Sequence, residues 1–181
     1  MQVKGTALRG VLAATEAVYG PSGLEAMLAG LTGEQQDALA NLVPSTWYPI
    51  AYSAEVHRSI TKHLGRGSTI ANYRVGVEAA RRDYGGVYRA VLWTMEPHSV
   101  LERMGRTWNQ YNSEGRVQIE RVADREARAV ITGASGYHDG MWQAVAGRVE
   151  GALKLCGVGS VRVTVGEHDA TGSIIDVVWT K

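Results

Sequence analysis

The sequence contains no phenylalanine and a single cysteine, Cys156, among its 181 residues. One cysteine excludes an internal disulfide and any zinc site built from several cysteines. Because the sequence around it is apolar with helical spacing, we expect Cys156 to be a small buried side chain rather than a reactive thiol. In the absence of phenylalanine, tryptophan, tyrosine and methionine must supply the large side chains of the core.

An excess of charge of one sign is also lacking, since the formal net charge is +1 and lysine and arginine are scattered. Binding to nucleic acid depends on clustered positive charge, so no nucleic-acid partner is expected. No apolar run approaches the roughly 18 residues of a membrane span, and the N-terminus lacks the apolar segment of a signal peptide. No linker or repeat divides the chain. We therefore expect a cytoplasmic protein in which residues 1–181 form a single domain.

The spacing of apolar residues changes within residues 101–122. Up to Tyr111 they recur at helical spacing, and from Arg116 they alternate as in a strand. The part before this change is helical by the same criterion. There, Thr32 and Gln35 predict a capping box, and Gly85-Gly86 predicts a kink or break in a long helical stretch. Residues 45–49 are expected to enter another helix, with Pro49 in its first turn.

Four strands and one helix are predicted after this change. The strands cover residues 116–122, 126–132, 161–165 and 175–179, and a helix capped by Asp139 lies between the second and the third. Antiparallel hairpins covered on one face by helices would bury these patterns most economically. The predicted fold is therefore α+β, with a helical N-terminal layer packed on a small antiparallel sheet and strand-strand-helix-strand-strand order in the C-terminal half.

The sequence has no motif for catalysis or metal binding, neither a Gly-x-Ser-x-Gly elbow nor an HExxH pair. His57 and His63 are six residues apart on one predicted helix, about 240° around its axis, so they cannot share a metal ion. His98, in the first turn of a helix, is expected at the surface or as a cap. An enzyme is therefore not favoured, and no catalytic residue, metal ligand or cofactor is assigned.

Aromatic and arginine side chains gather near the change of spacing. Two interpretations fit them: they line an apolar cavity between the helices and the sheet, or they fill the core in place of phenylalanine. In the first interpretation, Arg106 or Arg116 supplies the polar contact. The candidate ligand-binding residues are Tyr84, Tyr88, Trp93, Trp108, Tyr111 and Arg116.

The layout as a whole resembles a family of uncharacterised, myxobacterial-type bacterial proteins. The residues that carry the resemblance are the start VKGTALRGVLAA, the segments WYP and GGVYR, and GALKLCGVGSVRV before the last strands. That family is similar in turn to the superfamily of 4-vinyl reductase domains, heme nitric-oxide-binding domains and TRAPP-type vesicle-tethering subunits. The resemblance implies helices on a small antiparallel sheet, an internal cavity for an apolar ligand or cofactor, and dimerisation.

The heme carriers of that superfamily use a Tyr-x-Ser-x-Arg motif at the heme propionates and an upstream histidine. Here Tyr111 and Ser113 have the spacing of the motif, but Arg116 comes one residue late, and His98 is too near Tyr111. The 4-vinyl reductase domains carry cysteines near their C-terminal hairpin, and this chain has none there. These departures disfavour a heme and a metal ion.

We therefore expect a non-catalytic, cytoplasmic ligand-binding or regulatory module that encloses an apolar small molecule between its helices and its sheet. The alternative is a structural adaptor that forms a homodimer through its helical layer and contacts another protein. A fully packed interior would count against the ligand-binding module, and a pocket that holds a copurified molecule would count against the adaptor.

Overall fold

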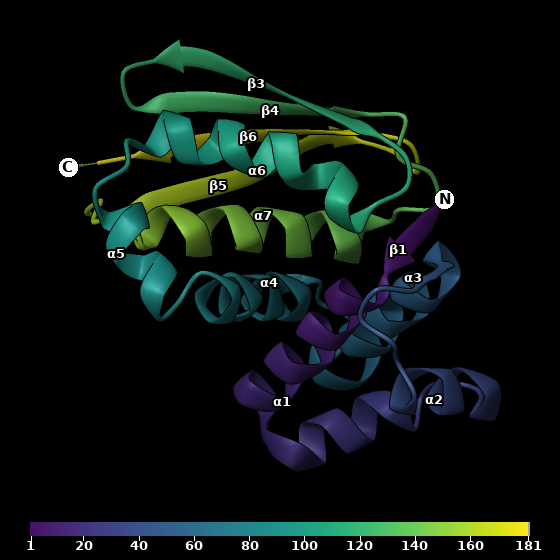
Figure 1. Cartoon of the computed structure of the whole chain (residues 1–181). Helices are drawn as coiled ribbons and strands as arrows, with labels where there is room; N and C mark the ends of the chain where they lie inside the picture. The colour runs from purple at the N-terminus through teal and green to yellow at the C-terminus, as the bar shows by residue number, and fades with distance from the viewer. Residues whose placement is uncertain (181) are drawn as a thin grey trace.

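A computed structural model of the chain describes residues 1–180, apart from the side chains of Val87 and Tyr88. The predicted α+β fold and the order of elements in its C-terminal half are confirmed (Figure 1). No helix in this described part combines the length and the hydropathy needed to cross a bilayer. In chain order the elements are β1 (Gln2–Lys4), α1 (Gly5–Leu28), α2 (Gly33–Ala40), β2 (Trp47–Pro49), α3 (Ile50–Ser59), η1 (Ile60–Leu64), α4 (Ile70–Asp83), α5 (Val87–Trp93), α6 (Pro97–Tyr111), β3 (Arg116–Ala123), β4 (Glu126–Thr132), α7 (Asp139–Lys154), β5 (Val161–His168) and β6 (Ser173–Trp179).

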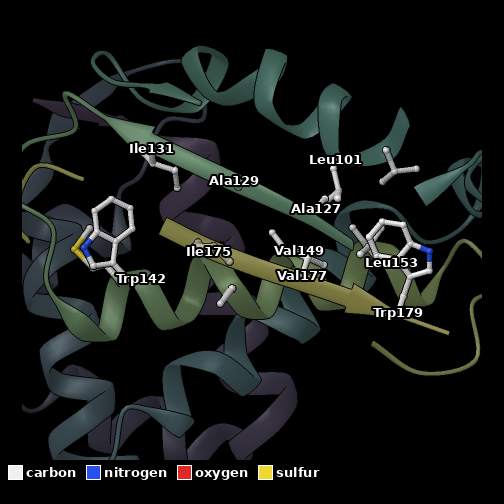
Figure 2. Close-up of a cluster of buried hydrophobic side chains, with 14 of the residues drawn as sticks. Leu101, Ala127, Ala129, Ile131, Trp142, Val149, Leu153, Ile175, Val177 and Trp179 are labelled. Atoms are coloured by element: carbon white, nitrogen blue, oxygen red, sulfur yellow. The ribbon is translucent and has the colours of Figure 1, made fainter. Parts of the chain in front are cut away.

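The main sheet is antiparallel throughout, with the strand order β3-β4-β6-β5. Alternate residues of β4 and β6 are buried against α6 and α7, which forms the first hydrophobic core. The residues between them point to the other face, where Arg128 and Asp176 form an ion pair at 2.8 Å. Side chains of the first core labelled in Figure 2 are Leu101, Ala127, Ala129, Ile131, Trp142, Val149, Leu153, Ile175, Val177 and Trp179.

Helix α7 lies between the sheet and α4 (Figure 1). Glycines bring these two helices into backbone contact. A Cβ atom on Gly76 would lie 2.1 Å from the carbonyl oxygen of Ala144, and one on Gly147 would lie 2.1 Å from that of Tyr73. No side chain larger than hydrogen fits at either point, so the sequence of this interface dictates how closely the helices approach.

A second hydrophobic core lies among the N-terminal helices, at the end of the molecule away from the main sheet (Figure 1). Its fully buried members come from α1, α3, η1 and α4, and include Leu8, Met27, Val56, Ile60 and Val75. The interior of the protein is therefore divided into two cores rather than one.

Three local predictions from the helical half are confirmed. Thr32 and Gln35 form the capping box at the start of α2. The helical stretch breaks at Gly86, which has a φ of 64° and separates α4 from α5. Cys156 is buried, and burial raises the pKa of its thiol to about 11.

The entry into α3 differs from its prediction. Residues 47–49 are not helical but form β2, which pairs with β1 and places Tyr48 opposite Val3. The helix begins at Ile50, after Pro49, because the fixed φ of proline suits both an extended residue and a helix boundary.

Two histidines also differ from their predictions. His138, not Asp139, caps α7, since its Nδ1 atom accepts the Gly140 amide hydrogen at 3.2 Å. His98 is buried rather than at the surface, and its Nε2 atom donates to the Ala123 carbonyl oxygen at 3.1 Å. Both imidazoles also bond residues that are distant in the sequence, His98 through the Ala123 carbonyl oxygen and His138 through that of Ala54. The local spacing of residues does not reveal such contacts.

Candidate functional site

A cavity of about 170 Å³ lies between the two hydrophobic cores. One wall comes from α1, α3 and α4, and the other comes from α6, α7 and the strands β3 and β4. Most of its surface is hydrocarbon, as is usual for sites that bind small molecules. Representative lining residues are Val11, Val75, Ala79, Leu101, Ile119 and Met141.

Three of the aromatic candidates from the sequence, Tyr84, Trp108 and Tyr111, line this cavity. Trp93 does not, because 62% of it is exposed and its ring lies against Gly157. The side chain of Tyr88 falls outside the described part of the structure.

The arginine at the cavity is not one of the two predicted from the sequence. Arg106 and Arg116 are exposed and lie outside the lining, and Arg116 points away because Val117, its neighbour on β3, points in. Arg148 of α7 lines the cavity instead, and its guanidinium pairs with the Asp83 carboxylate.

Several polar groups in the lining already have partners within the protein. The Tyr137 hydroxyl donates to Asn112 Oδ1 at 3.2 Å, and Trp108 Nε1 donates to the Glu114 carbonyl oxygen at 2.9 Å. Tyr137 also stacks on Trp142, with ring centroids 4.2 Å apart, and burial raises its pKa well above the ordinary value. These groups hold the walls together, so they are not free to bind a ligand.

His57 of α3 lines the same cavity and is only 4% exposed. Its Nδ1 atom lies 2.7 Å from Asn72 Oδ1. The orientation of Asn72 follows from Thr61, whose hydroxyl donates to the His57 carbonyl oxygen at 3.0 Å and so accepts from Asn72 Nδ2 at 2.6 Å. Asn72 therefore presents its carbonyl oxygen to Nδ1, and Nδ1 must carry the hydrogen.

The other ring nitrogen of His57, Nε2, consequently carries a lone pair. It has no hydrogen-bond partner among the described residues, and it is not one of their fully enclosed unpaired atoms. Burial lowers the pKa of His57 to about 4, against the opposing effect of the Asn72 hydrogen bond, and the charges of His138 and Arg148 lower it further. At neutral pH the cavity therefore contains a neutral imidazole with an open acceptor.

Ser53 lies one turn before His57 and lines the same cavity, with 6% of its surface exposed. Within the described part of the chain its hydroxyl has no hydrogen bond, either to His57 or to another group. A histidine activates a serine nucleophile through a direct hydrogen bond. The pair therefore lacks the contact on which serine hydrolase chemistry depends.

Sequence reasoning missed Ser53, His57, Asn72 and Arg148. The spacing of four residues between Ser53 and His57 places both on one helix face, which is the one signal that could have identified the pair. Asn72 is on a different helix, so no spacing predicts its contact with His57.

Three solved structures show the same fold at low sequence identity. An oxygen-binding H-NOX domain related to soluble guanylate cyclases, in its oxygen complex, superposes with a TM-score of 0.71 at 14% identity, covering 98% of this chain and 95% of that chain. The Fe(II) unliganded H-NOX protein from K. algicida gives 0.70 at 9% identity, covering 98% and 97%. A structure described as "Modulating Heme Redox Potential Through Protein-Induced Porphyrin Distortion" gives 0.68 at 14% identity, covering 98% and 95%. At such identities the likeness establishes the fold.

The cavity of this chain does not fit a heme. Its volume of about 170 Å³ is below the roughly 300–1,000 Å³ of pockets for drug-sized ligands, and a porphyrin is larger than those ligands. His57 offers one nitrogen that could ligate iron, but the groups that would bind the propionates are not assembled. Ser113 accepts the Gln2 amide hydrogen at 2.8 Å, and Arg116 is exposed on β3, so neither joins Tyr111 at the cavity.

A metal ion held by protein side chains alone is not supported either. Residues 1–180 contain no group of three histidine, cysteine, aspartate or glutamate side chains placed to hold one. Of the two histidines considered from the sequence, His57 is buried and lines the cavity, whereas His63 is exposed.

No curated protein matches the sequence. A family model described as "Protein of unknown function (DUF2378)" matches residues 3–180, which is almost the whole chain. The chain, whose helices and antiparallel sheet have the arrangement seen in H-NOX structures, therefore belongs to the DUF2378 family.

Proposed function

We propose that the protein is a ligand-binding, regulatory module that encloses a small apolar molecule in the cavity between its two cores. The observation that carries the proposal is the hydrocarbon-lined cavity of about 170 Å³. An engineered apolar cavity of about 150 Å³ in another protein stays dry and binds benzene, so a ligand of one aromatic ring matches this space.

The position of the cavity supports a regulatory role. A ligand in it touches α1, α3 and α4 of one core and α6, α7 and the sheet of the other. Occupancy therefore changes the free energy of contact between the two cores, which is how a bound molecule shifts a conformational equilibrium. The H-NOX-like fold is consistent with this role, because the relative described above as oxygen-binding also takes up a small molecule.

The polar groups of the cavity favour a protein that binds its ligand without catalysing a reaction. Ser53 and His57 are not hydrogen-bonded to each other, and the polar atoms of Trp108 and Tyr137 have partners within the walls. Among the described side chains that line the cavity, a nucleophile, its base and donors for a developing charge are not assembled at one point.

The proposal is tested by the thermal shift that toluene produces in the whole chain. Gly105 of α6 lines the cavity, and a Cβ atom there meets its nearest neighbours, Val117 and Ile119, at 3.5 Å, which is ordinary contact. Gly105→Leu therefore fills the cavity without a backbone clash. We expect toluene to raise the Tm of the wild type and to leave that of Gly105→Leu unchanged, because ligands stabilise only the state that binds them.

Gly105→Ala is the matched control, since it removes the same helix glycine but adds only one carbon, and its Tm should still respond to toluene. An equal response in wild type and Gly105→Leu would place binding elsewhere, and no response in the wild type would exclude the cavity as a site for apolar molecules. The absorption spectrum of the purified protein tests the conclusion on heme, because a Soret band would contradict it.

A further inference from the structure

Two polar groups in the cavity stand out because they are buried and the walls still leave them without a hydrogen bond. His57 Nε2 is an acceptor and the Ser53 hydroxyl is a donor, and neither has a partner among the described residues. Both side chains are more than nine-tenths buried. Buried polar groups are nearly always hydrogen-bonded, so an unused donor and an unused acceptor in one cavity indicate that something else bonds them.

Neighbouring side chains determine that His57 Nε2 is a hydrogen-bond acceptor. Asn72 and Thr61 hold the hydrogen of the imidazole on Nδ1, through contacts of 2.7 and 2.6 Å. Rotation of the ring would break the Asn72 contact inside the protein, where a lost hydrogen bond is costly. Nε2 is therefore a preorganised acceptor on a residue that lines the apolar cavity.

The two groups are complementary to a hydroxyl. They lie four residues apart on α3, so they are adjacent on one helix face. An O–H group donates one hydrogen bond and accepts others. One hydroxyl can therefore donate to His57 Nε2 and accept from Ser53, whereas a methyl group of the same size leaves both unpaired.

Resting on the proposed function, we infer that the ligand is a small, uncharged apolar molecule with one hydroxyl group, of the size and chemistry of a phenol, whose hydroxyl binds between His57 and Ser53. The hydrocarbon lining takes the ring, and the volume of about 170 Å³ limits the ligand to about one ring. Arg148, the charged side chain in the lining, is paired with Asp83, so it creates no demand for an anionic group.

The test compares phenol with toluene, which differ only in a hydroxyl in place of a methyl group. A purely apolar cavity prefers toluene, because the hydroxyl loses its bonds to water on entry. If the hydroxyl is bonded as inferred, phenol binds the wild type more tightly than toluene by about tenfold, which is the effect of one net hydrogen bond. Affinities are measured by titration of the whole chain, followed by NMR.

His57→Phe keeps a ring of similar shape but removes Nε2, so the order of the two ligands should reverse in favour of toluene. Ser53→Ala should reduce the preference for phenol. The matched control is Ser59→Ala, a buried serine on the same helix whose hydroxyl already bonds the Met27 carbonyl oxygen. It should leave the preference unchanged.

A direct readout separates ligand contact from a structural effect. In protein labelled with ¹⁵N-histidine, phenol should move the Nε2 resonance of His57 and toluene should not, because only phenol donates a hydrogen bond to it. Wild-type protein that binds both ligands equally, or prefers toluene, would overturn the inference while leaving the apolar cavity as a binding site. Wild-type protein that binds neither would overturn the proposed function itself.

Discussion

Asn72 Oδ1 accepts a hydrogen bond from His57 Nδ1 at 2.7 Å, and this contact joins α4 to α3 inside the helical half. It determines which nitrogen of the imidazole is left without a partner in the described part of the chain. On its own this hydrogen bond raises the pKa of His57, but burial has the larger effect and lowers it to about 4, so the imidazole is neutral at pH 7.

Asn72→Asp should raise the pKa of His57. A carboxylate beside Nδ1 favours the imidazolium, and a neighbouring opposite charge moves a pKa by about 1–3 pH units. The measurement is an NMR titration of the His57 Cε1 hydrogen, starting from a wild-type pKa of about 4. Asn109→Asp, at an exposed position on α6, is the control and should not move it. A value near 4 in Asn72→Asp would contradict the Asn72 contact.

The protein should lose stability as the pH falls from 6.5 to 4. His57 has a pKa of 6.5 when unfolded and about 4 when folded, so in this range the unfolded state binds more protons. Well above pH 6.5 His57 is neutral in both states, so it does not reduce the free energy of unfolding. By pH 4 its protonation in the unfolded state lowers that free energy by about 3 kcal/mol.

Urea unfolding of wild type and His57→Phe between pH 7 and pH 4 measures this loss. The variant should show a shallower fall over the same range. Burial also lowers the pKa of His138, and that contribution is common to both proteins. Parallel curves for the two proteins would show that His57 is not the group responsible.

Gly147→Ala should destabilise the fold by about 1–3 kcal/mol or more, because its Cβ would meet the Tyr73 carbonyl oxygen and force α4 and α7 apart. Urea denaturation gives the free energy of unfolding. Gly10→Ala is the control, since the atom nearest to its Cβ would be 4.0 Å away, and it should gain about 0.5–1 kcal/mol from helix propensity. Equal effects of the two changes would argue against backbone contact between these helices.

His138→Ala should cost about 1–3 kcal/mol, because it removes the cap of α7 and the Nε2 contact to the Ala54 carbonyl oxygen at 3.0 Å. His138→Asn retains a capping oxygen but not the reach to Ala54, so its stability should be intermediate. Thermal unfolding of the three proteins checks the order. If Asn and Ala have the same effect at this position, the cap contributes nothing.

The parts of the fold with regular spacing were predictable from the sequence. Alternation identified β4 to the residue, and the glycine pair identified the break before α5. The short strand β2 was not predictable, because its three residues have no period of their own and are extended only through pairing with β1. Tertiary contact, rather than local preference, decides such segments.

The candidate site was predicted only in part, for two different reasons. Arg116 could have been rejected from the sequence, since the alternation that predicts β3 places it on the opposite face from Val117 and Ile119. The spacing of His57 from Ser53 was the one signal for it, but its contact with Asn72 could not be predicted, because the two helices meet only when the chain has folded. Trp93 lies outside because the break at Gly86 redirects α5.

The backbone contact between α4 and α7 has a mechanical consequence for the cavity. At Gly76 and Gly147 the main chains of the two helices are in direct contact. No side chain lies between them there that could change its rotamer to accommodate a ligand. A molecule that enters the cavity is then accommodated by the other walls, among them α1 and α6. The strand β1 directly precedes α1, and its residue Val3 forms a bridge to Asn112 at the end of α6. The bridge between Val3 and Asn112 thus connects α1 to α6. A displacement of either helix would therefore also move the N-terminal strand.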